Sequence, residues 1–269
     1  MTTFIEYLQY PFFLRALIVG GFLSLILSWM SGYTVLRQEV LFTDALSNIG
    51  FLGIALAILF NLPITLMLIV VCLIAAYLIH VVQRGKLFQN DSLLEIFSRV
   101  GLALGIIVVG LFPGYRINIE QFLFGDILGI SSFDFWLTIV LLFGIGLVVL
   151  FSHRTFLKIS LSDTLSHSLV KYKKFWHGLL IFLLAIMIAL SMKIIGVLLV
   201  AAFTTIPSNT AKIFAKNISQ TFILSSLLGI VATFAGLYLS VLFNLPSGAL
   251  IVVVLGGFWV VGILYSRNF

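Results

Sequence analysis

Residues 36–53, LRQEVLFTDALSNIGFLG, place Asp44, Ser47 and Asn48 at the start of a long apolar run. Asp44 and Asn48 are four residues apart, so on a helix they share one face. A carboxylate in such surroundings is costly to desolvate and faces a protein interior, a watery cavity or a partner rather than lipid. The stretch therefore predicts a membrane helix with a candidate permeation site on one face.

The composition places the whole chain in a membrane. Of its 269 residues, 62% are hydrophobic and 9% are charged, which excludes a soluble domain with one core. Apolar runs of helical length that contain glycine indicate an α-helical bundle rather than a β-barrel. Residues 1–15 lack a basic segment and a cleavage site, so no removable signal peptide is expected. The lone Cys72 excludes an intramolecular disulfide.

The apolar runs predict an all-α polytopic bundle of eight or nine transmembrane helices in a single domain, 1–269. The run 175–206 is longer than the roughly 20 residues that one span needs. It is interrupted at Lys193, so we expect a full span, a turn there, and a short or re-entrant segment that ends at Pro207. The expected runs are 12–33, 44–61, 64–82, 93–111, 133–151, 175–206, 220–243 and 247–265, with a short amphipathic piece at 119–130.

Basic residues predict the orientation. If the N-terminus is outside, 11 of the 15 Lys and Arg lie on the cytoplasmic side, as the positive-inside rule requires. We therefore expect a multi-pass protein of the cytoplasmic (inner) membrane with a cytoplasmic C-terminus, and the net charge of +6 needs no nucleic acid to explain it. The 11 basic residues expected on the cytoplasmic side are Arg37, Arg84, Lys86, Arg154, Lys158, Lys171, Lys173, Lys174, Lys212, Lys216 and Arg267.

Two spacings predict how helices end and pack. LFNLP at 59–63 recurs at 242–246, each time after an outward-running span; an ancestral repeat and chance are both open. Gly101 and Gly105 have the small-xxx-small spacing that lets helices approach closely.

The histidines His80, His153 and His177 are expected at the membrane interface.

Three stretches resemble the permease subunits of zinc/manganese-type ABC importers. LFTDALSNIGFLGIA at 41–55 resembles the family's Asp-x-x-Ala/Ser-His signature, FLFGDILG at 122–129 its Phe-Gly-Asp motif, and MKIIGVLLVAAFTTIPSNTA at 192–211 its Met-Lys-x-x-Gly stretch. The resemblance covers nearly the whole chain, with the three motifs in the family's order and spacing.

The resemblance implies a transport subunit rather than an enzyme. Its expected partners are a cytoplasmic ABC ATPase dimer, an extracellular or periplasmic substrate-binding protein and a second copy of the chain. The sequence contains no G-x-x-x-x-G-K-[ST] motif, so ATP belongs on the partner and no cofactor is expected on this chain. The expected cargo is a divalent metal, zinc or manganese.

The chain departs from the family at two positions. Asn48 stands where the family has His, and Arg99 where it commonly has a second His. An amide oxygen is a weak ligand for zinc, and a guanidinium cannot coordinate a metal. We nevertheless expect Asp44, Ser47, Asn48 and Arg99 to line the substrate pathway, with Asp44 as the metal ligand.

Arg99 leaves three alternatives open. It can form a buried or half-buried ion pair with Glu95 or Asp44, contact an anionic or chelated substrate, or lie exposed near the inner face. Unpaired and about 6 Å from a divalent ion, it would repel that ion by about 5 kcal/mol at an effective dielectric of about 20.

Two further segments are candidate contacts. At 207–219, Pro207 is expected to stop one helix, Ser208 or Asn209 to cap a coupling helix, and Lys212 and Lys216 to share a face that contacts the ATPase; an ordinary positive-inside loop is the alternative. Gly125 and Asp126 are expected to shape the outer side, either as a capped turn or as an outer gate.

Other functions remain open. The same permease architecture can move a chelate or a small organic molecule. An ion-gradient-coupled secondary transporter with Asp44 as its proton or cation site and a non-transporting membrane anchor or sensor are further alternatives. The stretch 162–167, SDTLSH, repeats the Asp-x-x-Ser-His pattern but lies in a basic inner segment, where a surface or ATPase contact or a regulatory metal site is possible.

Overall fold

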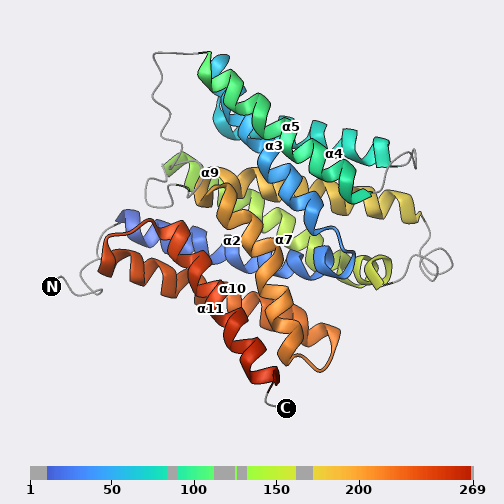
Figure 1. Cartoon of the computed structure of the whole chain (residues 1–269), viewed down its shortest axis with the longest axis vertical. Coiled ribbons are helices and arrows are strands. Elements are labelled where there is room, and N and C mark those ends of the chain that lie inside the picture. The colour runs from blue at the N-terminus through green and yellow to red at the C-terminus, as the bar shows by residue number, and fades with distance from the viewer. Residues whose placement is uncertain (1–10, 84–89, 112–124, 126–131, 162–171, 268–269) are drawn as a thin grey trace.

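The computed structural model describes residues 11–83, 90–111, 125, 132–161 and 172–267, and every regular element within them is an α-helix (Figure 1). All eight described helices are long and apolar enough to cross a membrane, which confirms the predicted all-α bundle. They are α2 (Pro11–Leu36), α3 (Val40–Leu59), α4 (Ile64–Gln83), α5 (Asn90–Gly110), α7 (Ser132–Leu161), α9 (Lys173–Phe214), α10 (Ile218–Phe243) and α11 (Ser247–Arg267).

Most predicted spans agree with these helices to within four residues at each end. The exceptions are α7, which continues ten residues past its predicted end at Phe151 to Leu161, and α9, which continues eight residues past Ile206 to Phe214. Arg154 and Lys158 lie exposed on the extension of α7, so that helix continues beyond the apolar run that predicted it. The predicted piece at 119–130, apart from Gly125, and the stretch 162–167 lie outside the described residues.

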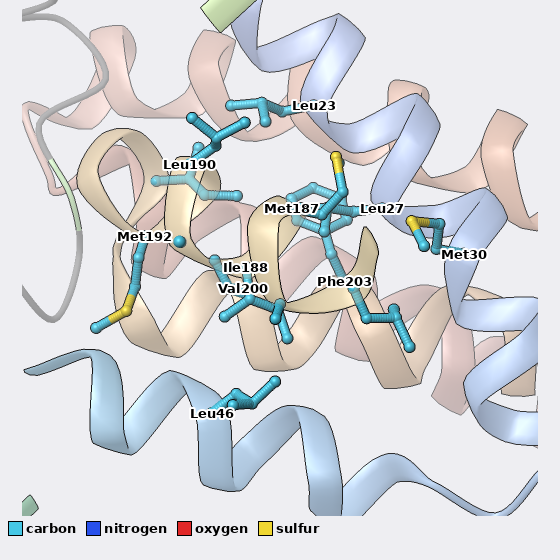
Figure 2. Close-up of a cluster of buried hydrophobic side chains, with 14 of the residues drawn as sticks. Leu23, Leu27, Met30, Leu46, Met187, Ile188, Leu190, Met192, Val200 and Phe203 are labelled. Atoms are coloured by element: carbon cyan, nitrogen blue, oxygen red, sulfur yellow. The ribbon is translucent and has the colours of Figure 1, made fainter. Parts of the chain in front are cut away.

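Helix α9 forms the centre of the bundle. It packs against α2, α3, α4, α7, α10 and α11, while α3, α4 and α5 lie together on one side of it and α10 and α11 on the other (Figure 1). Figure 2 shows the core that results. Leu23, Leu27 and Met30 of α2, Leu46 of α3 and Met187 of α9 are among its buried side chains.

A break at Gly196 divides the 42 residues of α9 into two arms. Gly196 has φ 80° and ψ 164°, a conformation that in practice only glycine adopts. Figure 1 shows the chain changing direction within α9, which confirms the turn expected near Lys193. Lys193 Nζ donates a hydrogen bond to Thr65 Oγ1 at the start of α4 over 3.0 Å, so the turn is tied to its neighbour.

The expectation that Pro207 stops a helix is wrong. The second arm of α9 passes through Pro207, which is buried, and ends at Phe214. A proline inside a helix removes one backbone hydrogen bond and costs about 3 kcal/mol. Within a membrane bundle, packing against neighbouring helices compensates for such a loss. The conformation that interrupts α9 belongs to Gly196, eleven residues earlier.

The repeated LFNLP stretches adopt the same turn. Asn61 and Asn244 take left-handed conformations at the ends of α3 and α10, with φ 52° and 54°. The following backbone N–H donates five residues back in both cases, Leu62 to Ala57 over 2.9 Å and Leu245 to Ser240 over 3.3 Å. This is a helix-terminating turn in which asparagine tolerates positive φ. The proline that follows at each site then precedes the next helix.

Glycines bring α3 and α5 together, as the 101/105 spacing predicted. A Cβ built on Gly101 would lie 2.5 Å from Ile49 Cγ1, and one on Gly105 would lie 2.6 Å from Phe51 Cδ1. The two backbones therefore approach closely enough for short polar side chains to bridge the helices.

Candidate functional site

The polar face predicted on α3 bonds directly to α5. Asn48 Nδ2 donates hydrogen bonds to Ser98 Oγ on α5 over 2.7 Å and to Asp44 Oδ2 over 3.3 Å. Asp44 and Asn48 are half-buried, and Ser98 is 2% exposed. The two amide hydrogens of Asn48 are thus used within the protein, and the Asp44 carboxylate accepts a further hydrogen bond from Ser98, while Asn48 Oδ1 has no hydrogen bond to any described residue.

Ser47 lies away from this face. Its hydroxyl donates to Thr43 O over 2.9 Å within α3, and its side chain is fully buried. The structure thus brings Asp44, Asn48 and Ser98 together but not Ser47. Sequence reasoning missed Ser98, although its position one residue before Arg99 and three after Glu95 marks it as part of the same polar stretch of α5.

Arg99 forms the intrahelical ion pair that its spacing predicts. Its Nε and Nη2 each lie 2.8 Å from Glu95 Oε1. No ion pair joins Arg99 to Asp44, and of the alternatives left open for Arg99 the buried pair is wrong for a single chain, because the side chains of Arg99 and Glu95 are 74% and 47% exposed. Charged groups facing lipid are costly, so this face of α5 requires water or a protein partner in the membrane.

The face offers oxygen ligands to a cation. The Asp44 carboxylate and the Asn48 amide oxygen are one helical turn apart, and carboxylate and amide oxygens suit hard divalent ions. No group of three His, Cys, Asp or Glu in the described part of the chain can hold a metal ion. In the described part of the chain, Asp44 and Asn48 thus supply two candidate oxygen ligands.

The segment 207–219 has a different local structure from the predicted coupling helix. Ser208 and Asn209 lie inside α9 rather than capping a new helix, and Asn209 Nδ2 donates to Thr205 O over 3.0 Å. Asn217 caps α10 instead, accepting a hydrogen bond from Gln220 N over 2.9 Å. Lys212 lies in the last turn of α9 and Lys216 in the break, both exposed, so the prediction that they share one face of a coupling helix is wrong.

Gly125 packs against the break in α9. It has φ 73°, and a Cβ built on it would lie 2.5 Å from Ile194 O and 2.6 Å from Gly196 N. Only glycine fits this contact with this backbone conformation. Asp126 lies outside the described residues, so the predicted outer-side role of this pair stays a prediction.

A second charged cluster, which sequence reasoning missed, joins the turn between α2 and α3 to α9. Arg37 Nε lies 2.8 Å from Glu39 Oε1, and His177 Nε2 lies 3.2 Å from the same oxygen. Arg37 also donates to Ile159 O of α7 over 3.1 Å, and the His177 ring contacts the His80 ring of α4 at a tilt, with centroids 5.5 Å apart. The cluster thus connects helices on the predicted cytoplasmic side.

Glu39 makes this cluster sensitive to acid. Burial raises the pKa of Glu39, but the hydrogen bond with His177 and the charge of Arg37 lower it more, so the pKa lies below its ordinary 4.5. A carboxylate with a lowered pKa contributes stability above its unfolded pKa and loses that contribution as the pH falls through its folded pKa.

We expect Glu39→Gln to lower the free energy of unfolding by about 2 kcal/mol at pH 7, because it removes the charged acceptor that Arg37 and His177 share. Thermal unfolding in detergent at pH 7 and at pH 4 measures the effect. The gap to wild type should narrow between pH 7 and pH 4, because the stability contributed by a carboxylate with a lowered pKa decreases as the pH falls. Glu95→Gln, in an exposed pair, should cost less than about 0.5 kcal/mol. An equal gap at both pH values would contradict this role.

His153 also has a more specific environment than a membrane interface. Its Nδ1 lies 2.5 Å from Tyr33 Oη, and its ring packs against Trp29 and Phe222. Tyr33 and Phe222 are almost fully buried. The histidine therefore joins α7 to α2 and α10 through an aromatic cluster.

Comparisons with known proteins agree along almost the entire chain. Residues 9–266 match the family described as the ABC 3 transport family. The chain is 30% identical over 248 residues to the manganese transport system membrane protein MntC of Listeria monocytogenes, covering 92% of this chain and 88% of that protein. It is 31% identical over 243 residues to the high-affinity zinc uptake system membrane protein ZnuB of Haemophilus influenzae, covering 88% and 91%.

A solved structure has the same fold. The structure of PsaBC from Streptococcus pneumoniae in complex with Fab superimposes with a TM-score of 0.86 and 28% sequence identity. The match covers 96% of this chain and 94% of that chain.

Proposed function

Since the chain belongs to the ABC 3 transport family, we propose that it is the permease subunit of an ATP-driven importer that carries a divalent metal ion, manganese in preference to zinc. Relatives named for manganese and for zinc transport support the class of cargo. In this proposal a substrate-binding protein delivers the ion, cytoplasmic ATPase subunits supply the energy, and the permease performs no covalent chemistry.

The contact between Asp44, Asn48 and Ser98 carries the choice of metal. Asn48 donates both amide hydrogens within the protein, so it offers the ion an oxygen. Asp44 offers a second oxygen. Zinc is a borderline soft ion that binds well to imidazole and thiolate, whereas oxygen ligands suit manganese. An asparagine in place of the family's histidine therefore favours manganese.

The ion pair between Arg99 and Glu95 on α5 reduces the repulsion that Arg99 would exert on a cation. An unpaired Arg99 would repel a divalent ion, but Glu95 lies 2.8 Å from the guanidinium and offsets its charge. With Asp44 the three charged groups carry a net charge of −1 in their usual states. A cation is thus attracted to this face as a whole, even though one of its residues is an arginine.

A second copy of the chain completes the pathway in this proposal. Arg99 and Glu95 are exposed on α5 among outward apolar residues such as Ile96, Val100 and Ile107. Two copies that present this face to each other would remove the charges from lipid and enclose a polar path. Each copy would add its own Asp44 and Asn48 as ligands.

We expect the assembled transporter in vesicles to accumulate manganese faster than zinc when ATP is supplied. Asn48→His should shift the zinc-to-manganese rate ratio by about tenfold toward zinc, corresponding to about 1.4 kcal/mol, because it replaces an oxygen ligand by a nitrogen. Uptake of both metals over time measures the ratio. Asn244→His, at the exposed end of α10, is the matched control and should leave the ratio unchanged.

Two results would contradict the proposal. A wild-type preference for zinc that Asn48→His does not alter would show that this face does not select the metal. Transport by the purified chain without any ATPase would indicate a secondary transporter instead.

A further inference from the structure

A pocket of about 230 Å³ lies where three helices meet on the predicted cytoplasmic side. It is formed by the last two turns of α2, the end of α9 and the first turn of α10. Its lining residues are Gly32, Leu36, Lys212, Ala215, Lys216, Asn217, Ile218, Thr221 and Phe222. A volume below about 300 Å³ is small for an organic ligand but sufficient for one inserted side chain.

The pocket lies next to a close contact between α2 and α10. Gly32 has no side chain, and a Cβ built there would lie 2.5 Å from Phe222 Cε1, so α2 and α10 touch at this level. Beyond this contact, α2 ends at Leu36, α9 ends at Phe214 and α10 begins at Ile218. The helices therefore separate, and Leu36, Ile218 and Phe222 form an apolar floor.

The positive charges of Lys212 and Lys216 are what the pocket offers a polar partner, because its other polar side chains form hydrogen bonds within the protein. Asn217 Oδ1 accepts a hydrogen bond from Gln220 N, and Thr221 Oγ1 donates to Asn217 O over 3.3 Å. Lys212 and Lys216 pair with no acidic side chain in the described part of the chain. The sequence from residue 164 to 269 contains no Asp or Glu at all. The acid that matches these lysines must therefore come from elsewhere.

We propose that the pocket receives an aspartate or glutamate side chain of the ATPase subunit, an inference that rests on the proposed function. The methylene groups of such a side chain would contact the apolar floor, and its carboxylate would lie between Lys212 and Lys216. Phe214, exposed beside the pocket, adds apolar contact area, which a protein partner buries.

The pocket connects mechanically to the candidate pathway. Lys212 lies two turns beyond Thr204 on the same arm of α9. Thr204 Oγ1 lies 3.2 Å from Thr43 Oγ1 on α3, and Thr204 O accepts a hydrogen bond from Thr34 on α2 over 3.0 Å. Thr43 directly precedes Asp44. A displacement of the end of α9 by the ATPase would thus act on the helix that carries the pathway residues.

The test uses the tagged full-length chain co-expressed with the ATPase subunit of the same transporter. Lys212→Glu with Lys216→Glu reverses the charge, whereas Ala215→Phe fills the pocket without changing charge. Lys158→Glu, exposed near the end of α7, is the matched control for charge. The ATPase recovered per permease is measured for each variant, with thermal unfolding in detergent as the check on folding.

We expect at least about tenfold less ATPase with the double lysine variant and about fivefold less with Ala215→Phe, against less than twofold with Lys158→Glu. Replacing an acidic residue of the ATPase by lysine should restore recovery with the double variant and reduce it with wild type.

Several outcomes would overturn the inference. Full recovery with Ala215→Phe would mean that the lysines act at the surface and the pocket is empty in the complex. Full recovery with both variants would place the ATPase elsewhere while leaving the proposed function intact. If ATPase recovery is normal and the double variant instead loses binding to vesicles that contain phosphatidylglycerol, the pocket holds a lipid headgroup. Failure of the wild type to bind the ATPase would contradict the proposed function itself.

Discussion

Asp44→Ala is expected to lower ATP-driven metal uptake at least about 100-fold, because the substitution removes the carboxylate that a cation meets on α3. Glu95 cannot replace it, since its carboxylate is bound to Arg99 over 2.8 Å. Asn48 would lose one of its two acceptors and would no longer be held with its oxygen toward the path. Both the charge and the orientation of the ligand set depend on this residue.

Uptake of manganese into vesicles measures the effect, and thermal unfolding in detergent distinguishes it from misfolding. Asp91→Ala is the matched control, because Asp91 is exposed in the first turn of α5. It should retain uptake within about twofold and unfold like wild type. Unchanged uptake by Asp44→Ala would show that this face is not the path.

Gly196→Ala is expected to have the largest effect on stability. Its φ of 80° and ψ of 164° fall in a region that costs other residues about 1–3 kcal/mol. Gly125 presses against this turn from outside, so the backbone cannot relax freely. We expect a loss of about 3 kcal/mol and a fall in Tm of about 10 °C. Uptake should fall as well, because both arms of α9 contact α3, which carries Asp44 and Asn48.

Gly178→Ala is the matched control for this substitution. It lies in the first arm of the same helix, and nothing lies within 4 Å of a Cβ built there. Alanine in a regular helix is about 0.5–1 kcal/mol better than glycine, so this variant should be as stable as wild type or slightly more stable. If both variants unfold at the same temperature, the break at Gly196 is not a constrained turn.

Local patterns in the sequence predicted much of the fold. Hydropathy gave the spans because each bilayer crossing needs about 20 apolar residues, a property of one segment alone. The Glu95–Arg99 pair and the shared face of Asp44 and Asn48 follow from the spacing of four residues on a helix. The small-residue spacing of Gly101 and Gly105 likewise predicted close packing. These features depend on neighbours along the chain, so they survive without knowledge of the tertiary structure.

Long-range contacts decided the rest. Ser98 reaches Asn48 across 50 residues of sequence, and His177 reaches Glu39 across 138. Such pairs depend on how each helix is rotated about its axis and on which neighbour it packs against, which no local spacing encodes. Pro207 shows the same limit, because burial within the bundle preserves a helix that the proline alone would have ended. The sequence by itself determined a membrane helix with an acid on one face. The tertiary structure decided which serine holds the neighbouring asparagine, and thereby which oxygens are left for a cation.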